Sequence, residues 1–156
     1  MELIIFIGAS GVGKSTLAKK LAKKSAYVYH DMDEETDIKR CGSIYLSQAA
    51  LALQKYSLDK TNTHICDFGA GFQNQPCFYD ILKPYADKLI NIHEENPEKI
   101  YRNRIPNRTL GEFTNTEHAS HRERLYKLAA FKLTRTDNPD NDVMKILNWL
   151  CGRSGG

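Results

Sequence analysis

A phosphate-binding loop motif near the N-terminus constrains this chain more than any other feature. Residues 8–16 read GASGVGKST, which fits the pattern G-x-x-x-x-G-K-[ST]. The apolar run 3–7 precedes the motif, and a segment with helical spacing, 17–22, follows it. Such a loop requires a strand before it and a helix after it, because loop amides and the helix N-terminus together bind phosphate oxygens. The motif therefore predicts a strand–loop–helix unit of an α/β fold.

Each residue type in the motif has a chemical role. Glycines let the backbone turn with positive φ, so that successive N–H groups point at phosphate oxygens. We expect Lys14 to reach the β- and γ-phosphates and the Ser15 hydroxyl to bind Mg²⁺. The residues predicted to bind the nucleotide are Gly8, Ser10, Gly11, Val12, Gly13, Lys14, Ser15 and Thr16.

The length and charge of the chain predict one globular domain that binds small molecules. With 156 residues, we expect a single domain over 1–152 and a disordered tail over 153–156. A net charge of +3 suits anionic small molecules and is too weak to indicate nucleic acid as a partner. We expect the protein to be a monomer.

Cysteine spacing and hydropathy predict a cytoplasmic protein. The four cysteines form no C-x-x-C pair and no zinc-binding spacing, which favours reduced thiols. The longest apolar run is too short to span a membrane, and residues 2–7 are interpreted as a strand and not as a signal peptide.

Strand-like and helix-like segments alternate along the chain. Further strands are expected at 26–30, 63–66, 88–92 and 131–133. Helices are expected at 15–24, 44–56, 76–83, 97–104, 116–130 and 138–150. This alternation predicts a five-stranded parallel sheet flanked by helices on both faces, a three-layer α/β/α fold. Ligands bind such sheets at the carboxyl ends of the strands.

An acidic segment, DMDEE, follows the second expected strand at 31–35. One carboxylate there could bind Mg²⁺, and another could accept a proton from a substrate hydroxyl. Asp31 and Asp33 are two residues apart, so in an extended segment their side chains would share a face. The segment could also be a solvated acidic turn.

The third expected strand is followed by Asp67 and by a glycine-containing turn, 69–71. A carboxylate at this strand end is where phosphate-loop enzymes hold Mg²⁺, so Asp67 is a second candidate ligand. Gly69 and Gly71 would let a substrate approach the backbone closely, although a plain turn explains them nearly as well.

Arginines are frequent between 101 and 126. An arginine on a mobile segment can stabilise the charge of a transferring phosphoryl group. The polar stretch around 105–115 would make a lid between two helices, so a lid is predicted over about 102–116. Several of these arginines could equally be ordinary exposed helix residues.

With these residues in place, the chain resembles shikimate kinase, within the nucleoside monophosphate kinase-like phosphate-loop fold. The resemblance runs over nearly the whole length and favours ATP as the nucleotide. Asp31-Met32-Asp33 is similar to that family's D-x-D, in which the first aspartate lies near Mg²⁺ and the second contacts substrate hydroxyls. Gly69-Ala70-Gly71 falls where the family has three glycines against the substrate.

The resemblance also assigns roles to residues further along the chain. Arg108 falls where the lid arginine is expected, and Arg122 opens a match to R-x-x-L-Y, whose arginine binds the substrate carboxylate. The stretch 134–139, which includes Asn138 and Pro139, is similar to the loop that encloses adenine. The resemblance thus implies Lys14, Asp33 and Arg108 as catalytic residues.

Three departures from the family pattern indicate an acceptor other than shikimate. The helix expected at 44–56 has no cation in 44–54, Ala70 replaces the middle glycine, and Asp67 adds a carboxylate near the substrate. The sequence therefore predicts an ATP-dependent kinase acting on a hydroxyl group of another small molecule. Two alternatives remain open: a nucleoside, nucleotide or polynucleotide 5′-kinase, and a nucleotide-dependent binding module with slow ATP hydrolysis.

Overall fold

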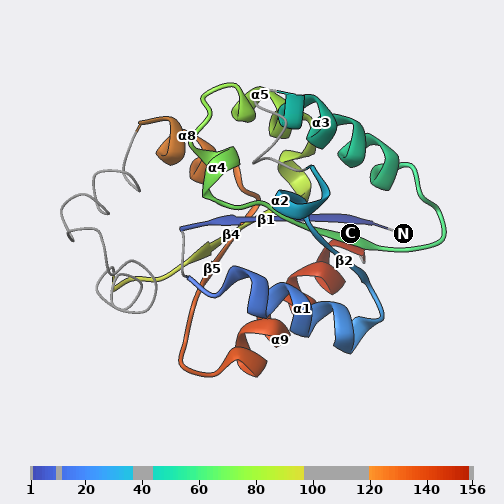
Figure 1. Cartoon of the computed structure of the whole chain (residues 1–156). Coiled ribbons are helices and arrows are strands. Elements are labelled where there is room, and N and C mark those ends of the chain that lie inside the picture. The colour runs from blue at the N-terminus through green and yellow to red at the C-terminus, as the bar shows by residue number, and fades with distance from the viewer. Residues whose placement is uncertain (1, 10–11, 37–43, 97–119, 155–156) are drawn as a thin grey trace.

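A five-stranded parallel sheet forms the centre of the computed structural model, which describes residues 2–9, 12–36, 44–96 and 120–154 (Figure 1). The strand order is β2-β3-β1-β4-β5, and every neighbouring pair is parallel. The strands are β1 (Leu3–Gly8), β2 (Val28–Asp31), β3 (His64–Asp67), β4 (Leu89–His93) and β5 (Phe131–Thr134). The predicted strand content and parallel pairing are confirmed.

Helices cover both faces of this sheet (Figure 1). One face carries α1 (Lys14–Ser25) and α9 (Pro139–Ser154). The other face carries α3 (Ile44–Ser57), α4 (Ala70–Gln73), α5 (Phe78–Leu82) and α8 (Ser120–Leu128). The short helix α2 (Met32–Glu35) follows β2, and a 3₁₀ helix, η1 (Lys83–Lys88), follows α5. The three-layer α/β/α architecture is therefore confirmed.

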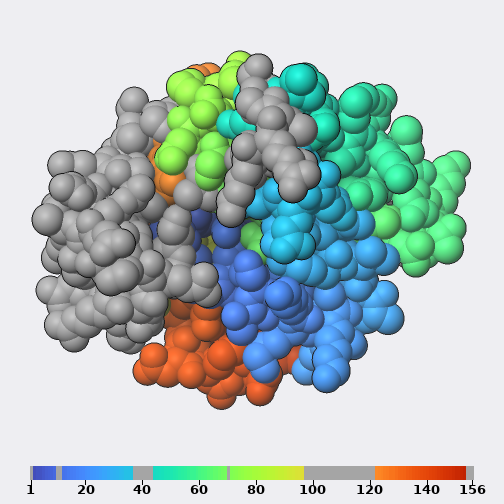
Figure 2. Space-filling view, in the orientation of Figure 1, coloured from blue at the N-terminus to red at the C-terminus, as the bar shows by residue number. Residues whose placement is uncertain are grey.

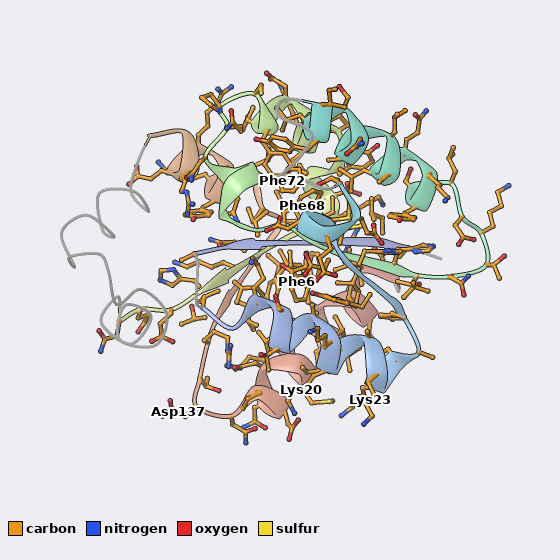
Figure 3. All side chains as sticks on the ribbon, in the orientation of Figure 1. Phe6, Lys20, Lys23, Phe68, Phe72 and Asp137 are labelled. Carbon is orange, nitrogen blue, oxygen red and sulfur yellow. The ribbon has the colours of Figure 1, made fainter. Side chains whose placement is uncertain are left out.

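The core is divided between the two faces by the alternation of side chains along β1. Ile4 and Phe6 pack toward α1 and α9, whereas Ile5 and Ile7 pack toward α3 and α5. Figure 3 shows Phe6 on the α1 side of the sheet. All six residues of β1 are buried, as expected for a central parallel strand covered on both faces.

Four aromatic rings form a closed cluster behind the end of β3, which we call the aromatic cluster. Its members are Tyr45, Phe68, Phe72 and Phe78. Phe68 packs against Phe72 and against Phe78 with ring centroids 4.9 Å apart, and Tyr45 lies 5.0 Å from Phe72. Figure 3 shows Phe68 and Phe72 on the side of the sheet opposite Phe6. The turn after β3 therefore rests on rigid edge-to-face packing.

Several helix boundaries differ from the sequence expectation. The helix expected at 76–83 is shorter, because η1 replaces its end near Pro84, which cannot donate an amide hydrogen bond. The short helices α2 and α4 were not expected, and α9 runs to Ser154, two residues into the predicted tail. The expected helix at 97–104, residues 116–119 and residues 155–156 lie outside the described residues. None of the helices in the described ranges is long and apolar enough to cross a membrane.

A stack of three rings joins α3 to the β2–β3 edge of the sheet. Tyr56 stacks on His30 and His64 with ring centroids 4.0 and 4.6 Å apart. The two imidazoles meet at 2.8 Å between His30 Nε2 and His64 Nδ1. Glu35 pairs with His30 at one end, and Asp59 pairs with His64 Nε2 at 2.6 Å at the other. This stack fixes the end of α3 and the loop after it.

We expect the Asp59–His64 contact to stabilise the fold at neutral pH and to lose this effect at acidic pH. The hydrogen bond from His64 and the amides of Thr61 and Asn62 lower the pKa of Asp59 to about 2. A lowered pKa in the folded state gives stability that is complete above the unfolded pKa of about 4 and is lost as the pH falls toward 2. Asp59→Asn should therefore unfold at lower urea concentration than the parent at pH 6, and the gap should close by about pH 2. The role of Asp59 would be contradicted if the difference in urea midpoint between variant and parent did not change at low pH. It would also be contradicted if Asp80→Asn, at an exposed site, gave an equal difference.

Candidate active site

Gly8 and Gly13, on either side of the loop between β1 and α1, have the backbone conformations that the motif predicts. Gly8 and Gly13 have positive φ, at 153° and 86°. Gly13 adopts the left-handed conformation and caps the N-terminus of α1. The amide of Gly8 donates to Gln73 Oε1 at 3.2 Å, so a buried side chain from α4 holds the start of the loop. These glycines therefore provide the turns for which the motif needs them.

Lys14, Ser15 and Asp67 meet at the carboxyl end of β3. Lys14 Nζ lies 3.2 Å from Asp67 Oδ1, and the Ser15 hydroxyl donates to Asp67 Oδ2 at 2.6 Å. The side chains of Lys14 and Asp67 are both buried, at 10% and 4% exposure. Phe6 of β1 is the register partner of Asp67, which places this carboxylate directly beside the phosphate loop. The structure thus brings together three residues that the sequence assigned to the nucleotide and metal.

Tyr29 is a further member of this group that sequence reasoning missed. Its hydroxyl donates to Asp67 Oδ2 at 3.0 Å. Burial, followed by the charge of Asp67, raises the pKa of Tyr29 well above its usual range, so the phenol remains a neutral donor. The alternation of β2 offered a signal, because Tyr29 lies two residues before Asp31 and therefore on the same face of the strand.

The segment from Asp31 to Asp33 is extended only at Asp31, so the condition for the expected shared face is not met. Helix α2 begins at Met32, and Asp31 caps it by accepting the amide of Asp33 at 3.1 Å and that of Glu34 at 3.4 Å. An aspartate at a strand end readily satisfies free helix amides in this way. The Asp31 carboxylate is thus already hydrogen-bonded to amides of α2. Asp31 is also the last residue of β2 and pairs with Asp67 in the register of the sheet.

Asp33 reaches from α2 to the turn after β3. Its Oδ1 atom accepts the amide of Gly69 at 3.1 Å. A Cβ atom at position 69 would collide with the Asp33 carboxylate, so the glycine is needed for this approach. Burial raises the pKa of Asp33, as do the charges of Asp31 and Asp67, whereas the Gly69 amide and Lys14 act in the opposite direction. Asp33 is therefore electrostatically coupled to the group around Lys14.

The remaining members of the glycine turn lie in and beside α4. Ala70 and Gly71 begin this helix, and Gln73 Nε2 donates to the carbonyls of Phe68 at 3.0 Å and Gly69 at 3.3 Å. Gln73 thus links the turn to the phosphate loop through its bond to Gly8. No local pattern in the sequence indicates this buried glutamine.

Arg122 of α8 is fully buried, at 0% exposure. Its Nε atom donates to Asn74 Oδ1 at 2.9 Å, and Nη1 donates to Tyr126 at 3.2 Å. Asn74 directly follows α4, so the guanidinium stands beside the segment that carries the glycine turn. The predicted substrate-binding residues are thus brought to one region, with Arg122 enclosed by protein.

Arg135 is the third residue of this region that the sequence did not single out. It directly follows β5, and its Nη1 atom donates to the carbonyl of Val12 in the phosphate loop at 2.8 Å. Asn138, predicted to bind the nucleotide, caps α9 by accepting the amides of Asp140 and Asn141. Pro139 opens that helix. The turn after β5 therefore contacts the phosphate loop directly.

Three predicted site residues, Ser10, Gly11 and Arg108, lie outside the described residues, as does the lid expected over 102–116. Thr16 is exposed in the first turn of α1. A surface hollow of about 360 Å³ lies along α1 and α9, lined by Lys20, Lys23, Lys24, Asp140 and Val143. It involves the later turns of α1 and not the end that carries Lys14.

The oxygens of Ser15 and Asp67 fit a divalent cation of the magnesium type. Asp67 Oδ1 is buried and accepts no hydrogen bond from the residues that the structure describes, although Lys14 stands nearby. Hydroxyl and carboxylate oxygens are hard ligands, and Mg²⁺ usually keeps several waters and phosphate oxygens besides one or two protein ligands. Within the described ranges no cluster of three or more His, Cys, Asp or Glu side chains could hold a metal by itself.

Comparison with known proteins shows the fold. Shikimate kinase from Aquifex aeolicus vf5 is 23% identical, with a TM-score of 0.69 over 100% of both chains. A gluconokinase from Sinorhizobium meliloti 1021 is 13% identical, with a TM-score of 0.57 over 98% of this chain and 97% of that one. Deoxyadenosine kinase from M. mycoides is 18% identical, with a TM-score of 0.55 over 97% and 99%. No protein-family model and no curated protein matches the chain. The chain has the fold of P-loop kinases of the shikimate and nucleoside monophosphate kinase type.

Proposed function

We propose that this protein is a P-loop kinase that transfers the γ-phosphoryl group of ATP to a hydroxyl group of a small molecule. The observation that supports this most strongly is the convergence of Lys14, Ser15 and Asp67 beside the phosphate loop. Asp33 stands at the neighbouring strand end, within electrostatic reach of the same group. The fold shared with three kinases of different acceptors adds support at the level of architecture.

In this proposal the loop and its neighbours bind the triphosphate with its metal. Loop amides and the N-terminus of α1 hold phosphate oxygens, and Lys14 neutralises charge on the transferred group. Ser15 and Asp67 hold Mg²⁺, which neutralises charge on the phosphates when bound. Tyr29 keeps the Asp67 carboxylate oriented. Arg108 remains the predicted lid residue.

Asp33 is the group proposed to bind the acceptor hydroxyl and remove its proton. The Gly69 amide fixes its position, and partial burial raises its pKa, which makes the carboxylate a stronger base. The proton leaves the hydroxyl as its oxygen attacks the γ-phosphorus atom, and the bond from that phosphorus to the β-phosphate oxygen breaks.

The charges around Asp33 support an acceptor without a negative charge, and hence one other than shikimate. The charges of Asp31 and Asp67 both raise the pKa of Asp33 and that of Lys14 lowers it, so two carboxylates act on Asp33 against one cation. Arg122 is fully buried against Asn74 and Tyr126. Over Ile44–Ser57, α3 carries one basic residue, Lys55, in its last turn. We therefore propose a neutral or cationic alcohol as the acceptor.

An acceptor screen tests the proposal directly. ADP release should be followed with MgATP and separate panels of polyols, sugars, shikimate, nucleosides and 5′-hydroxyl oligonucleotides. Turnover with one class of neutral or cationic alcohol that is not a nucleoside, such as a polyol or a sugar, is the expected result. Turnover with nucleosides or oligonucleotides would instead indicate that the protein is a nucleoside, nucleotide or polynucleotide 5′-kinase. Tight MgATP binding without a phosphorylated product in any panel would indicate a nucleotide-dependent binding module.

Asp67→Asn should weaken the magnesium-dependent part of nucleotide binding. The amide keeps the acceptor for Ser15 and Tyr29 but lacks the charge that a hard cation needs. Calorimetry should give an affinity for MgATP reduced about tenfold or more, with ATP in EDTA bound about as before. Asp80→Asn, which changes an exposed carboxylate of α5, serves as the matched control. Unchanged magnesium dependence in Asp67→Asn would remove this carboxylate from the metal site.

A further inference from the structure

The guanidinium of Arg135 lies between the phosphate loop and the turn that joins β5 to α9. The amide of Arg135 donates to His93 O at 2.7 Å, one step beyond the register pair of His93 and Thr134. The backbone of the turn is therefore anchored to the sheet. Figure 1 shows the connection from β5 to α9 passing the N-terminal end of α1, and Figure 2 shows orange atoms of the C-terminal part of the chain against blue atoms of its N-terminal part. Arg135 has 13% side-chain exposure, so little of it faces solvent.

A fully buried carboxylate holds this guanidinium in place. Arg135 Nε donates to Asp142 Oδ2 at 3.0 Å, and Asp142 has 0% exposure in the first turn of α9. The Thr136 hydroxyl also donates to Asp142 at 2.8 Å, and the Thr136 amide does so at 3.1 Å. Charge-assisted hydrogen bonds of this kind are strong and restrict the geometry of both partners. Arg135 is therefore preorganised before any ligand arrives.

The same guanidinium fixes the end of the phosphate loop. Its Nη1 atom donates to Val12 O at 2.8 Å, and it occupies the position that a Cβ atom at residue 13 would need. Gly13 caps α1 without a side-chain hydrogen bond, so the cap itself contributes no such restraint. This hydrogen bond points the Val12 carbonyl oxygen at the Arg135 guanidinium. A carbonyl oxygen turned toward the bound phosphates would repel their oxygens.

We propose that Arg135 is a nucleotide-positioning residue: by tying the Val12 carbonyl to buried Asp142, it holds the phosphate loop in the shape that accepts a polyphosphate. The turn after β5 and the phosphate loop then respond to the nucleotide as one unit. This inference rests on the proposed function, because both concern the same nucleotide. It assigns to Arg135 a role in binding that neither the loop motif nor the fold likeness specifies.

Two magnesium-loaded probes separate loop positioning from contact with a nucleoside. MgADP carries a base and ribose, whereas magnesium tripolyphosphate presents only the phosphate chain. If Arg135 acts by shaping the loop, its loss should weaken both probes by a similar factor. If it contacted only the base or ribose, MgADP alone would weaken.

The variants are chosen so that the buried carboxylate is never left without a partner. Arg135→Gln combined with Asp142→Asn replaces the ion pair by neutral amides, and the amide oxygen introduced at position 142 can still accept from Thr136. Removing only one partner of a buried ion pair is strongly destabilising, because it leaves an unpaired charge, and the double replacement avoids that cost. Arg135→Lys keeps the charge but cannot bridge Asp142 and the Val12 carbonyl as the guanidinium does. Its affinity for both probes should therefore lie between that of the double variant and that of the parent. Lys132→Gln, an exposed cation on β5, is the matched control.

Calorimetry with both probes and a melting curve for each variant complete the experiment. We expect the double variant to melt within a few degrees of the parent and to bind both probes about tenfold or more weakly. Lys132→Gln should match the parent in both measurements. Parent-like affinity in the folded double variant, or weakening of MgADP alone, would overturn the role of Arg135 and leave the kinase proposal standing. Absence of binding by the parent protein would overturn both.

Discussion

Asp33→Asn should lower the turnover number for the acceptor about 10²- to 10⁴-fold, the range typical of general acid–base catalysis. Asparagine has nearly the same shape and can still accept the Gly69 amide, so the turn after β3 should keep its geometry. It cannot take a proton from the acceptor hydroxyl. Affinity for MgATP should therefore change little, and the loss should appear in steady-state rates at saturating nucleotide.

The neighbouring Glu34 offers the matched control, because it is an exposed carboxylate on the same short helix. Glu34→Gln removes the same charge one residue away and should retain close to full activity. Equal rates for Asp33→Asn and the parent would exclude Asp33 as the base. Equal losses in both variants would point to a general effect of charge near α2.

Lys14→Met should reduce phosphoryl transfer about 10²- to 10³-fold, because a cation aimed at developing phosphate charge is a major source of transition-state stabilisation. Methionine preserves the aliphatic length of the buried side chain. Asp67 retains its hydrogen bonds from Ser15 and Tyr29, so the carboxylate is not left without donors. Rates measured with saturating acceptor, together with the affinity for MgATP, show how the loss divides between binding and chemistry.

Lys24→Met provides the comparison for this variant, since Lys24 is exposed in the last turn of the same helix. It should behave like the parent in both rate and affinity. Parent-like rates in Lys14→Met would exclude Lys14 from the reaction. The proposal would then lack the cation that it assigns to the transferred phosphoryl group. A folded Lys14→Met protein is required for the comparison, and its melting curve checks this.

The sequence predicted the architecture well, because its signals were local. The apolar run 3–7 and the loop motif fix β1 and α1, and both were found close to the expected bounds. Strand ends were less accessible to sequence reasoning. Asp31 and Asp67 belong to β2 and β3 because they pair with each other across the sheet, and hydropathy alone does not indicate a charged strand residue.

The grouping of Lys14, Ser15 and Asp67 could be anticipated, since parallel strands bring their carboxyl ends to one edge. The conformation around Asp31 could not. A helix of four residues is too short to show a 3.6-residue period, so α2 leaves no pattern in the sequence. The capping bonds of Asp31 decide that conformation, and they compete with the extended geometry that strand alternation would suggest.

Tyr29, Gln73 and Arg135 escaped notice for a common reason. Their partners lie 38, 65 and 123 residues away in the sequence. A tyrosine in a strand, a glutamine in a short helix and an arginine after a strand are each ordinary in isolation. Only the folded topology brings them to the phosphate loop and to Asp67.

The aromatic cluster separates two tasks that the molecule must perform. Phe68, Phe72 and Phe78 are fully buried, so the turn bearing Gly69 packs on side chains that do not reach the surface. Replacements at the outer surface on the α3 side of the sheet should therefore not change the distance between Asp33 and Gly69. If the proposed kinase activity is correct, exchanges on that outer surface should leave the position of Gly69, and through its amide that of Asp33, unaltered.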